Sequence, residues 1–315
     1  MDKLLIFWVH LLLVFSLISS QASADFADEF NFEAANGRTP SRSIFWFPMF
    51  GLLVPGLPQI IKRQKTAGFT YLGVGAFGMA VALGTAADYI KNHDELDNAD
   101  IDESEITDQQ MAMIWGLQTY QTAGSLSLYH AFRTSVKAHH KDRFDFLPDD
   151  ETPDKLVLAP FKFSYLLRPT TYVPLLLMAG LSAQCINEHK NSKGDLRGTE
   201  TLFSLGISYN AGVGEESIFR GWMEPILYEK WGSPTAAHLT TALVFSAMHI
   251  TAANPVPWPQ FIAGYYLGWL TEINGWSITE SIFLHAWWDV IAIATAWSQG
   301  ADHIEVRLPT FQYRF

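Results

Sequence analysis

The charged residues of this chain are gathered into a few short segments, and apolar stretches lie between them. Only 17% of the residues are charged, against about 25% in a typical soluble domain. So little charge cannot cover the surface of a soluble protein, whereas spanning a bilayer requires apolar helices of about 20 residues. The pattern predicts an all-α, polytopic helical membrane protein with roughly seven to eight membrane-associated helices.

Net charge and cysteine content exclude other classes of protein. The chain holds 21 Lys and Arg against 32 Asp and Glu, a formal net charge of −11. Such an acidic chain is not expected to bind nucleic acid, since phosphate binding needs a basic surface. Its single cysteine, Cys185, excludes an internal disulfide and a cysteine-type zinc site.

The N-terminus is predicted to direct export. A charged start, an apolar run and the triplet Ala22-Ser23-Ala24 resemble a bacterial secretory signal that is cut after Ala24. An uncleaved signal anchor is the alternative. In either case residues 25–43 lie outside the cytoplasm, and the protein is predicted to be integral to the bacterial inner (plasma) membrane.

The apolar stretches that follow vary in length and in polar content. They are residues 44–61, 67–90, 110–136, 170–186, 202–213, 235–252, 261–273 and 278–297. The three prolines of the first stretch predict a bent or hairpin-like helix. Basic loops favour the cytoplasm, so the basic cluster 62–65 is placed inside and the acidic segment 93–108 outside as a loop.

These features predict four parts of the chain. A signal peptide or signal anchor at 1–24 precedes an N-terminal membrane region at 25–155, which holds the acidic loop and a polar linker. A domain at 156–300, with its core at 200–300, is followed by a C-terminal tail at 301–315.

Ionisable residues inside apolar stretches are the candidate functional groups, because a charge at bilayer depth costs about 2.5–3.5 kcal/mol on insertion scales. Glu215 and Glu216 follow an apolar helix directly. Glu216 can pair with Arg220 at i+4, which leaves Glu215 as an unpaired carboxylate suited to a general base. The alternative is a helix end at the membrane surface with a solvated ion pair.

Two further clusters have the same spacing. Phe245 and His249 share one helical face, as do His285 and Asp289. His249 alone is equally explained by a hydrogen bond to a carbonyl near the interface. His285 and Asp289 either form a structural pair between helices or converge on a metal ion or a water molecule.

The order and spacing of the three clusters resemble the CPBP family of intramembrane proteases. This family comprises CAAX prenyl endopeptidases and bacteriocin-processing, Abi-type proteins. The resemblance covers residues 200–300 and rests on Glu-Glu-x-x-x-Arg, Phe-x-x-x-His and His-x-x-x-Asp, with Phe219-Arg220-Gly221-Trp222 and the Gly264…Gly268 helix as further likeness. It implies an endopeptidase whose active site lies within the helical bundle.

The resemblance also implies a role for each motif residue. Glu215 activates a water and His249 helps to hold it, while His285 and Asp289 stabilise the oxyanion or support the groups that do. Glu216 with Arg220 and Phe245 are supporting residues that hold the helix and exclude water. The prenyl-protein branch has Asn where this chain has Asp289, and an ionised Asp cannot donate to an oxyanion.

The cofactor and the function class stay open at this point. Glu215, His249, His285 and Asp289 suit either a divalent metal such as Zn²⁺ or a metal-free mechanism, which we favour. Binding partners are expected to be the lipid bilayer and a membrane-associated peptide or protein substrate. The alternatives are a non-catalytic scaffold or immunity-type protein with the same fold, and an ion-binding transporter.

Overall fold

The computed structural model describes residues 44–95, 103–188, 198–250, 254–298, 307–308 and 311–312. Within these ranges the chain is a bundle of helices with one antiparallel ladder of two short strands, β1 (Arg307–Leu308) and β2 (Phe311–Gln312). The predicted all-α class is therefore confirmed. The predicted signal at 1–24 and the segment 25–43 lie outside the described residues, and the division into four parts stays a prediction.

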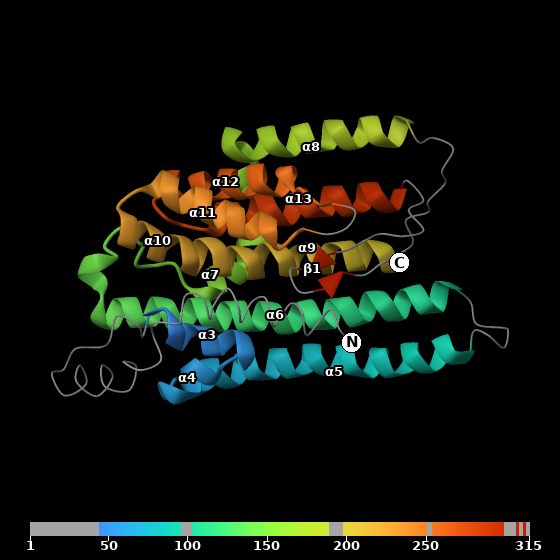
Figure 1. Cartoon of the computed structure of the whole chain (residues 1–315), viewed down its shortest axis with the longest axis horizontal. Coiled ribbons are helices and arrows are strands. Elements are labelled where there is room, and N and C mark those ends of the chain that lie inside the picture. The colour runs from blue at the N-terminus through green and yellow to red at the C-terminus, as the bar shows by residue number, and fades with distance from the viewer. Residues whose placement is uncertain are drawn as a thin grey trace.

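The long helices lie side by side, as Figure 1 shows. Neighbouring pairs follow the order α5, α6, α9, α13 and α8, while α11 and α12 pack together beside α13. Their bounds are α5 (Lys65–Glu95), α6 (Glu103–His139), α8 (Pro169–Glu188), α9 (Gly198–Ile218), α11 (Pro234–Ala247), α12 (Trp258–Ile273) and α13 (Thr279–Ser298). Short helical segments between α6 and α8 are η3 (Lys141–Arg143), α7 (Pro153–Leu158), η4 (Ala159–Phe161) and η5 (Phe163–Leu167).

The proline-rich stretch 44–61 forms a helical hairpin, as predicted. It consists of α3 (Trp46–Leu53) and α4 (Leu57–Ile61). Gly56 connects them with a φ of 86°, a conformation that glycine adopts without strain. The backbone N–H of Gly56 donates to Ser127 Oγ at 3.0 Å, which fixes the hairpin against α6.

The antiparallel pair α5 and α6 confirms the predicted helices at 67–90 and 110–136. Gly78 and Gly116 let the two backbones meet, since a Cβ added to either glycine would lie 2.6 Å from the carbonyl oxygen of the other. The acidic segment 93–108, predicted to be a loop, is partly helical. Helix α5 continues to Glu95 and α6 already begins at Glu103; acidic residues are in general favoured in the first turn of a helix.

The Glu215–Arg220 motif lies inside a long helical run rather than at a helix end. Helix α9 continues from Gly198 through a π-helical turn, η6 (Phe219–Met223), into α10 (Glu224–Trp231). Gly232, with φ 65°, ends this run. The predicted stretch 202–213 is thus only the middle of a longer helix, which buries both Glu215 and Glu216.

The bundle has buried charges and exposed apolar side chains, the reverse of a soluble protein. Large apolar side chains face outward along α5, α8, α11 and α12; examples are Phe69, Leu83, Leu176, Leu181, Leu243 and Ile262. Within the described residues one helix, at 65–87, is long and apolar enough by composition to cross a membrane. The prediction of seven to eight membrane-associated helices therefore stays a prediction.

The two ends of the α5–α6 pair differ in charge. The junction of α4 with α5 lies beside the C-terminal end of α6, and the C-terminal end of α5 lies beside the N-terminal end of α6 at the opposite end of the bundle (Figure 1). The basic segments 62–65 and 137–143 therefore share one end, while Glu95 and Glu103, where α5 ends and α6 begins, belong to the other. This separation is the one that the predicted orientation requires.

Candidate active site

Residues of the three motifs come together from three helices. Glu215 and Glu216 lie on α9, and Arg220 lies in the π-helical turn that follows it. Helix α11 ends just before His249, and α13 carries His285 and Asp289. Gly212 allows this approach, because a Cβ there would lie 2.9 Å from both the Cβ and the backbone nitrogen of Ala286 on α13.

Glu216 is the point at which two of the motifs meet. Its Oε1 accepts a hydrogen bond from Arg220 NH1 at 2.9 Å and another from His285 Nδ1 at 2.7 Å. The NH2 group of Arg220 donates to the carbonyl oxygen of Gly264 on α12 at 2.6 Å. Glu216 and Arg220 are fully buried. The predicted i, i+4 pair is confirmed, and it also ties α9 to α12 and α13.

The second nitrogen of His285 faces two carboxylates. Its Nε2 lies 3.5 Å from Asp289 Oδ2 and 3.8 Å from Glu215 Oε2. Nδ1 donates its proton to Glu216. Without a proton of its own, Nε2 would direct a lone pair at the two carboxylates, which is unfavourable. The geometry therefore favours a proton on His285 Nε2, close to Glu215.

Glu215 differs from its neighbour in having few partners. Its side chain is buried, and its Oε2 has no hydrogen-bond partner among the described residues. A buried carboxylate without hydrogen bonds is costly and is retained where chemistry needs it. This agrees with the expectation that Arg220 neutralises Glu216 and leaves Glu215 without a charged partner of this kind.

Phe245 is the aromatic centre that links the second motif to the other two. Its ring centroid lies 4.7 Å from that of His249 and 5.9 Å from that of His285. The guanidinium of Arg220 lies 5.0 Å from the same ring. His249 Nδ1 donates to the carbonyl oxygen of Phe245 at 2.8 Å, the bond expected for a histidine near a helix end. Its place beside Phe245 puts His249 at the edge of the site.

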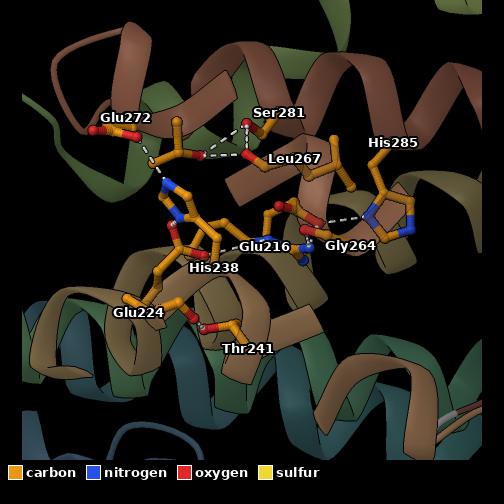
Figure 2. A network of polar contacts seen from close by, with 12 residues as sticks. Glu216, Glu224, His238, Thr241, Gly264, Leu267, Glu272, Ser281 and His285 are labelled. Atoms are coloured by element: carbon orange, nitrogen blue, oxygen red, sulfur yellow. Dashed lines mark hydrogen bonds and ion pairs between the residues drawn. The ribbon is translucent and has the colours of Figure 1, made fainter. Parts of the chain in front are cut away.

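A second buried cluster, which the sequence analysis missed, continues from Arg220. Glu224 Oε2 lies 4.0 Å from Arg220 Nε, and Glu224 Oε1 is 2.8 Å from His238 Nδ1. His238 Nε2 in turn lies 2.8 Å from Glu272 Oε2. Figure 2 shows this network running from His285 and Glu216 at one end to Glu272 at the other. The signal in the sequence was the continued i+4 spacing from Glu216 through Arg220 to Glu224.

A cavity that no motif residue lines lies apart from this site. Its volume is about 670 Å³, and it lies between the segment 148–168 and the start of α13. Lys162, Arg168 and Glu280 line it, and no motif residue does. The motif residues therefore form a cluster apart from this cavity.

The arrangement of the side chains does not suit a metal ion. In the described ranges no three His, Cys, Asp or Glu side chains are grouped so that they could hold one. Both nitrogens of His285 already face carboxylates, and Nδ1 of His249 bonds a carbonyl. The metal-ligand set Glu215, His249, His285 and Asp289 does not fit, and no step below passes through a metal.

Comparison with known proteins supports the motif assignment. Residues 197–291 match the family model described as "Type II CAAX prenyl endopeptidase Rce1-like". Searches of curated proteins and of solved structures find no match. The matched segment begins just before α9 and ends within α13, so it contains all three motifs. Residues 197–291 of this chain thus form an Rce1-like domain, consistent with an intramembrane protease of the CPBP family.

Proposed function

We propose that this protein is an intramembrane endopeptidase that cleaves a membrane-associated peptide or protein, with Glu215 as the general base. One observation carries the proposal. The buried Oε2 of Glu215 lacks a hydrogen bond and lies 3.8 Å from His285 Nε2. A carboxylate in this setting can take a proton from water.

The reaction we propose uses no side-chain nucleophile. Glu215 accepts one proton from a water as its oxygen adds to the carbonyl carbon of the peptide bond. The resulting tetrahedral intermediate then breaks its carbon–nitrogen bond. Glu215 returns the proton to the leaving nitrogen, so that the products are a carboxylic acid and an amine.

Histidine side chains would stabilise the charge that develops on the carbonyl oxygen. The donors that we propose are His285, whose Nε2 lies 3.8 Å from Glu215 Oε2, and His249, which packs against Phe245. Asp289, at 3.5 Å from Nε2, favours a proton there by its charge. This assigns Asp289 a supporting role, in place of the direct oxyanion contact that an Asn would make.

Glu216, Arg220 and Phe245 would serve as the frame of the site. Oε1 of Glu216 fixes the ring orientation of His285, and Arg220 neutralises Glu216. The ring of Phe245 packs against Phe219 at 5.2 Å between centroids and excludes water from this side. Such a dry, preorganised setting strengthens each electrostatic contact.

A membrane-associated substrate follows from the outer surface of the bundle. The exposed apolar side chains of α5, α8, α11 and α12 suit lipid. We place the protein in the bacterial inner membrane because of its predicted export signal. This N-terminus makes prenylated proteins of the eukaryotic kind an unexpected target for this chain.

The test compares the membrane peptidome of cells that carry the wild-type chain with that of cells carrying Glu215→Gln. Glu200→Gln is the matched control, because Glu200 is also buried on α9 but lies 15 residues away. Peptides produced by the wild type and by Glu200→Gln should disappear in Glu215→Gln. Unchanged peptides in the Glu215→Gln cells would contradict the protease function and favour a non-catalytic scaffold.

A further inference from the structure

Helix α6 forms one wall of the site, although it lies outside the Rce1-like domain. Thr122 Oγ1 donates to the backbone oxygen of Asn210 at 3.0 Å, and Asn210 Nδ2 donates to Thr119 Oγ1 at 3.3 Å. A Cβ on Gly214 would meet Thr122 Oγ1 at 3.1 Å. These contacts hold α6 tightly against α9, directly beside Glu215.

A small cavity lies between these two helices. Its volume is about 10 Å³, close to the smallest that holds one water molecule. Polar and small groups from α6 and α9 surround it, and they are Gln118, Gln121, Thr122, Asn210, Ala211, Gly214 and Glu215. On α6 the lining residues recur at i, i+3 and i+4, so they form one polar face.

Two oxygen atoms at this cavity lack a donor. Oε2 of Glu215 and Oε1 of Gln118 are both buried, and neither has a hydrogen-bond partner among the described residues. Both atoms are acceptors, so neither can satisfy the other. A single water between them donates one O–H to each and removes both deficits.

We infer that Gln118 and Glu215 hold the attacking water between them, so that α6 supplies a water-orienting residue to the active site. This inference rests on the proposed function. The water lies against the same carboxylate oxygen that is 3.8 Å from His285 Nε2. Its two hydrogens are directed at Glu215 and Gln118, which leaves an oxygen lone pair for attack on the peptide carbonyl. The N-terminal region thereby becomes part of the catalytic machinery.

The test uses Gln118→Met, which keeps the length of the side chain and removes its polar end. Gln59→Met is the control, because Gln59 is equally buried but bonds Ser127, away from Glu215. The measured output is the amount, per folded molecule, of the membrane peptides that wild-type cells produce and Glu215→Gln cells lack. We expect Gln118→Met to lower it about 10- to 100-fold, the loss of one hydrogen bond to a reacting group, and Gln59→Met to leave it unchanged.

A high-resolution experimental map of the full chain gives the second measurement. We expect one ordered water within hydrogen-bond distance of Glu215 Oε2 and Gln118 Oε1 in the wild type, and its loss in Gln118→Met. The inference is overturned if that water is absent, if the Gln118 amide bonds Glu215 directly, or if Gln118→Met keeps wild-type output. If Glu215→Gln abolishes the peptides and Gln118→Met does not, only this inference fails. If Glu215→Gln leaves them intact, the protease function itself fails and the inference falls with it.

Discussion

His285 Nδ1 donates a 2.7 Å hydrogen bond to Glu216 Oε1, the same oxygen that accepts from Arg220. The second carboxylate of the motif therefore connects the histidine of α13 to the arginine that follows α9. The Oε2 atoms of both Glu215 and Glu216 have no hydrogen-bond partner among the described residues, but Glu216 is held through its Oε1. We therefore expect a structural role for Glu216 and a chemical role for Glu215. The two residues should respond differently to the same substitution.

Glu215→Gln and Glu216→Gln test this division. Glu215→Gln removes a poorly solvated charge, so thermal stability should stay equal or rise while peptide cleavage is lost. Glu216→Gln removes the carboxylate that bonds both Arg220 and His285 and leaves Glu224, at 4.0 Å, as the counter-charge of Arg220. This loss should cost about 3–5 kcal/mol of unfolding free energy. Thermal unfolding of both purified variants, alongside cleavage, measures the contrast. Equal destabilisation by the two variants would show that the glutamates share one role.

Removal of Arg220 should destabilise the bundle about as strongly as Glu216→Gln does. Arg220→Met removes the arginine partner of buried Glu216 and breaks the 2.6 Å bond to Gly264, at an expected cost of about 3–5 kcal/mol of unfolding free energy. Arg143→Met is the control, because Arg143 pairs with Glu229 at the surface, where such a pair is worth about 0–1 kcal/mol. Denaturant or thermal unfolding in detergent gives both values. If Arg220→Met lowered the unfolding free energy less than Arg143→Met does, the buried Arg220–Glu216 pair would contribute nothing to stability.

Close contact between α9 and α13 should make Gly212 intolerant of a side chain. The Cβ of Gly212→Ala would lie 2.9 Å from Ala286, so α13 must move and His285 must leave Glu216. We expect a stability loss of about 1–3 kcal/mol together with reduced cleavage. Gly180→Ala, whose Cβ meets nothing within 4 Å, should instead stabilise α8 by about 0.5–1 kcal/mol. Wild-type cleavage by Gly212→Ala would show that the helices are not packed this closely.

Glu151 gives a prediction about pH. Its carboxylate accepts hydrogen bonds from Ser277 Oγ at 2.7 Å and from the backbone nitrogen of Ile278 at 2.8 Å, which anchors the start of α13. Burial raises the pKa of the Glu151 carboxyl above its ordinary value of 4.5, and the hydrogen bonds oppose this only in part. The folded chain therefore binds this proton more tightly than the unfolded chain.

The sign of the effect follows from linkage. Wild-type stability is lost as pH rises from about 4.5 through the raised pKa of the folded state. Glu151→Gln does not titrate, so its melting temperature relative to the wild type should increase across that window. Melting curves of both proteins at a series of pH values measure the difference. A difference that stays constant with pH would contradict the raised pKa.

Contacts within a helix were predictable from the sequence, because 3.6 residues per turn fix which side chains are neighbours. The pairs Glu216–Arg220 and His285–Asp289 were found in this way. The bond from His285 to Glu216 was not, since it depends on how α13 is rotated against α9. In the sequence Gln118 is one polar residue within the apolar stretch 110–136, and its place beside Glu215 depends on how α6 packs against α9.

Helix ends were less predictable than helices. The acidic segment 93–108 favours a solvated loop by charge alone, yet α6 already begins at Glu103. Acidic residues are in general favoured in the first turn of a helix, because the helix dipole is positive there. The π-helical turn at Phe219–Met223 left no signal in the pattern either, because its residues suit an ordinary helix equally well.

That π-helical turn decides how the two carboxylate clusters face each other. A π turn holds one residue more than an α-helical turn, and each residue rotates the following helix by about 100°. Glu215 and Glu216 precede the turn and Glu224 follows it. The extra residue therefore sets the angular phase between the catalytic cluster and the His238 cluster. Deleting one residue from this turn would put the two clusters out of phase without altering any of their side chains.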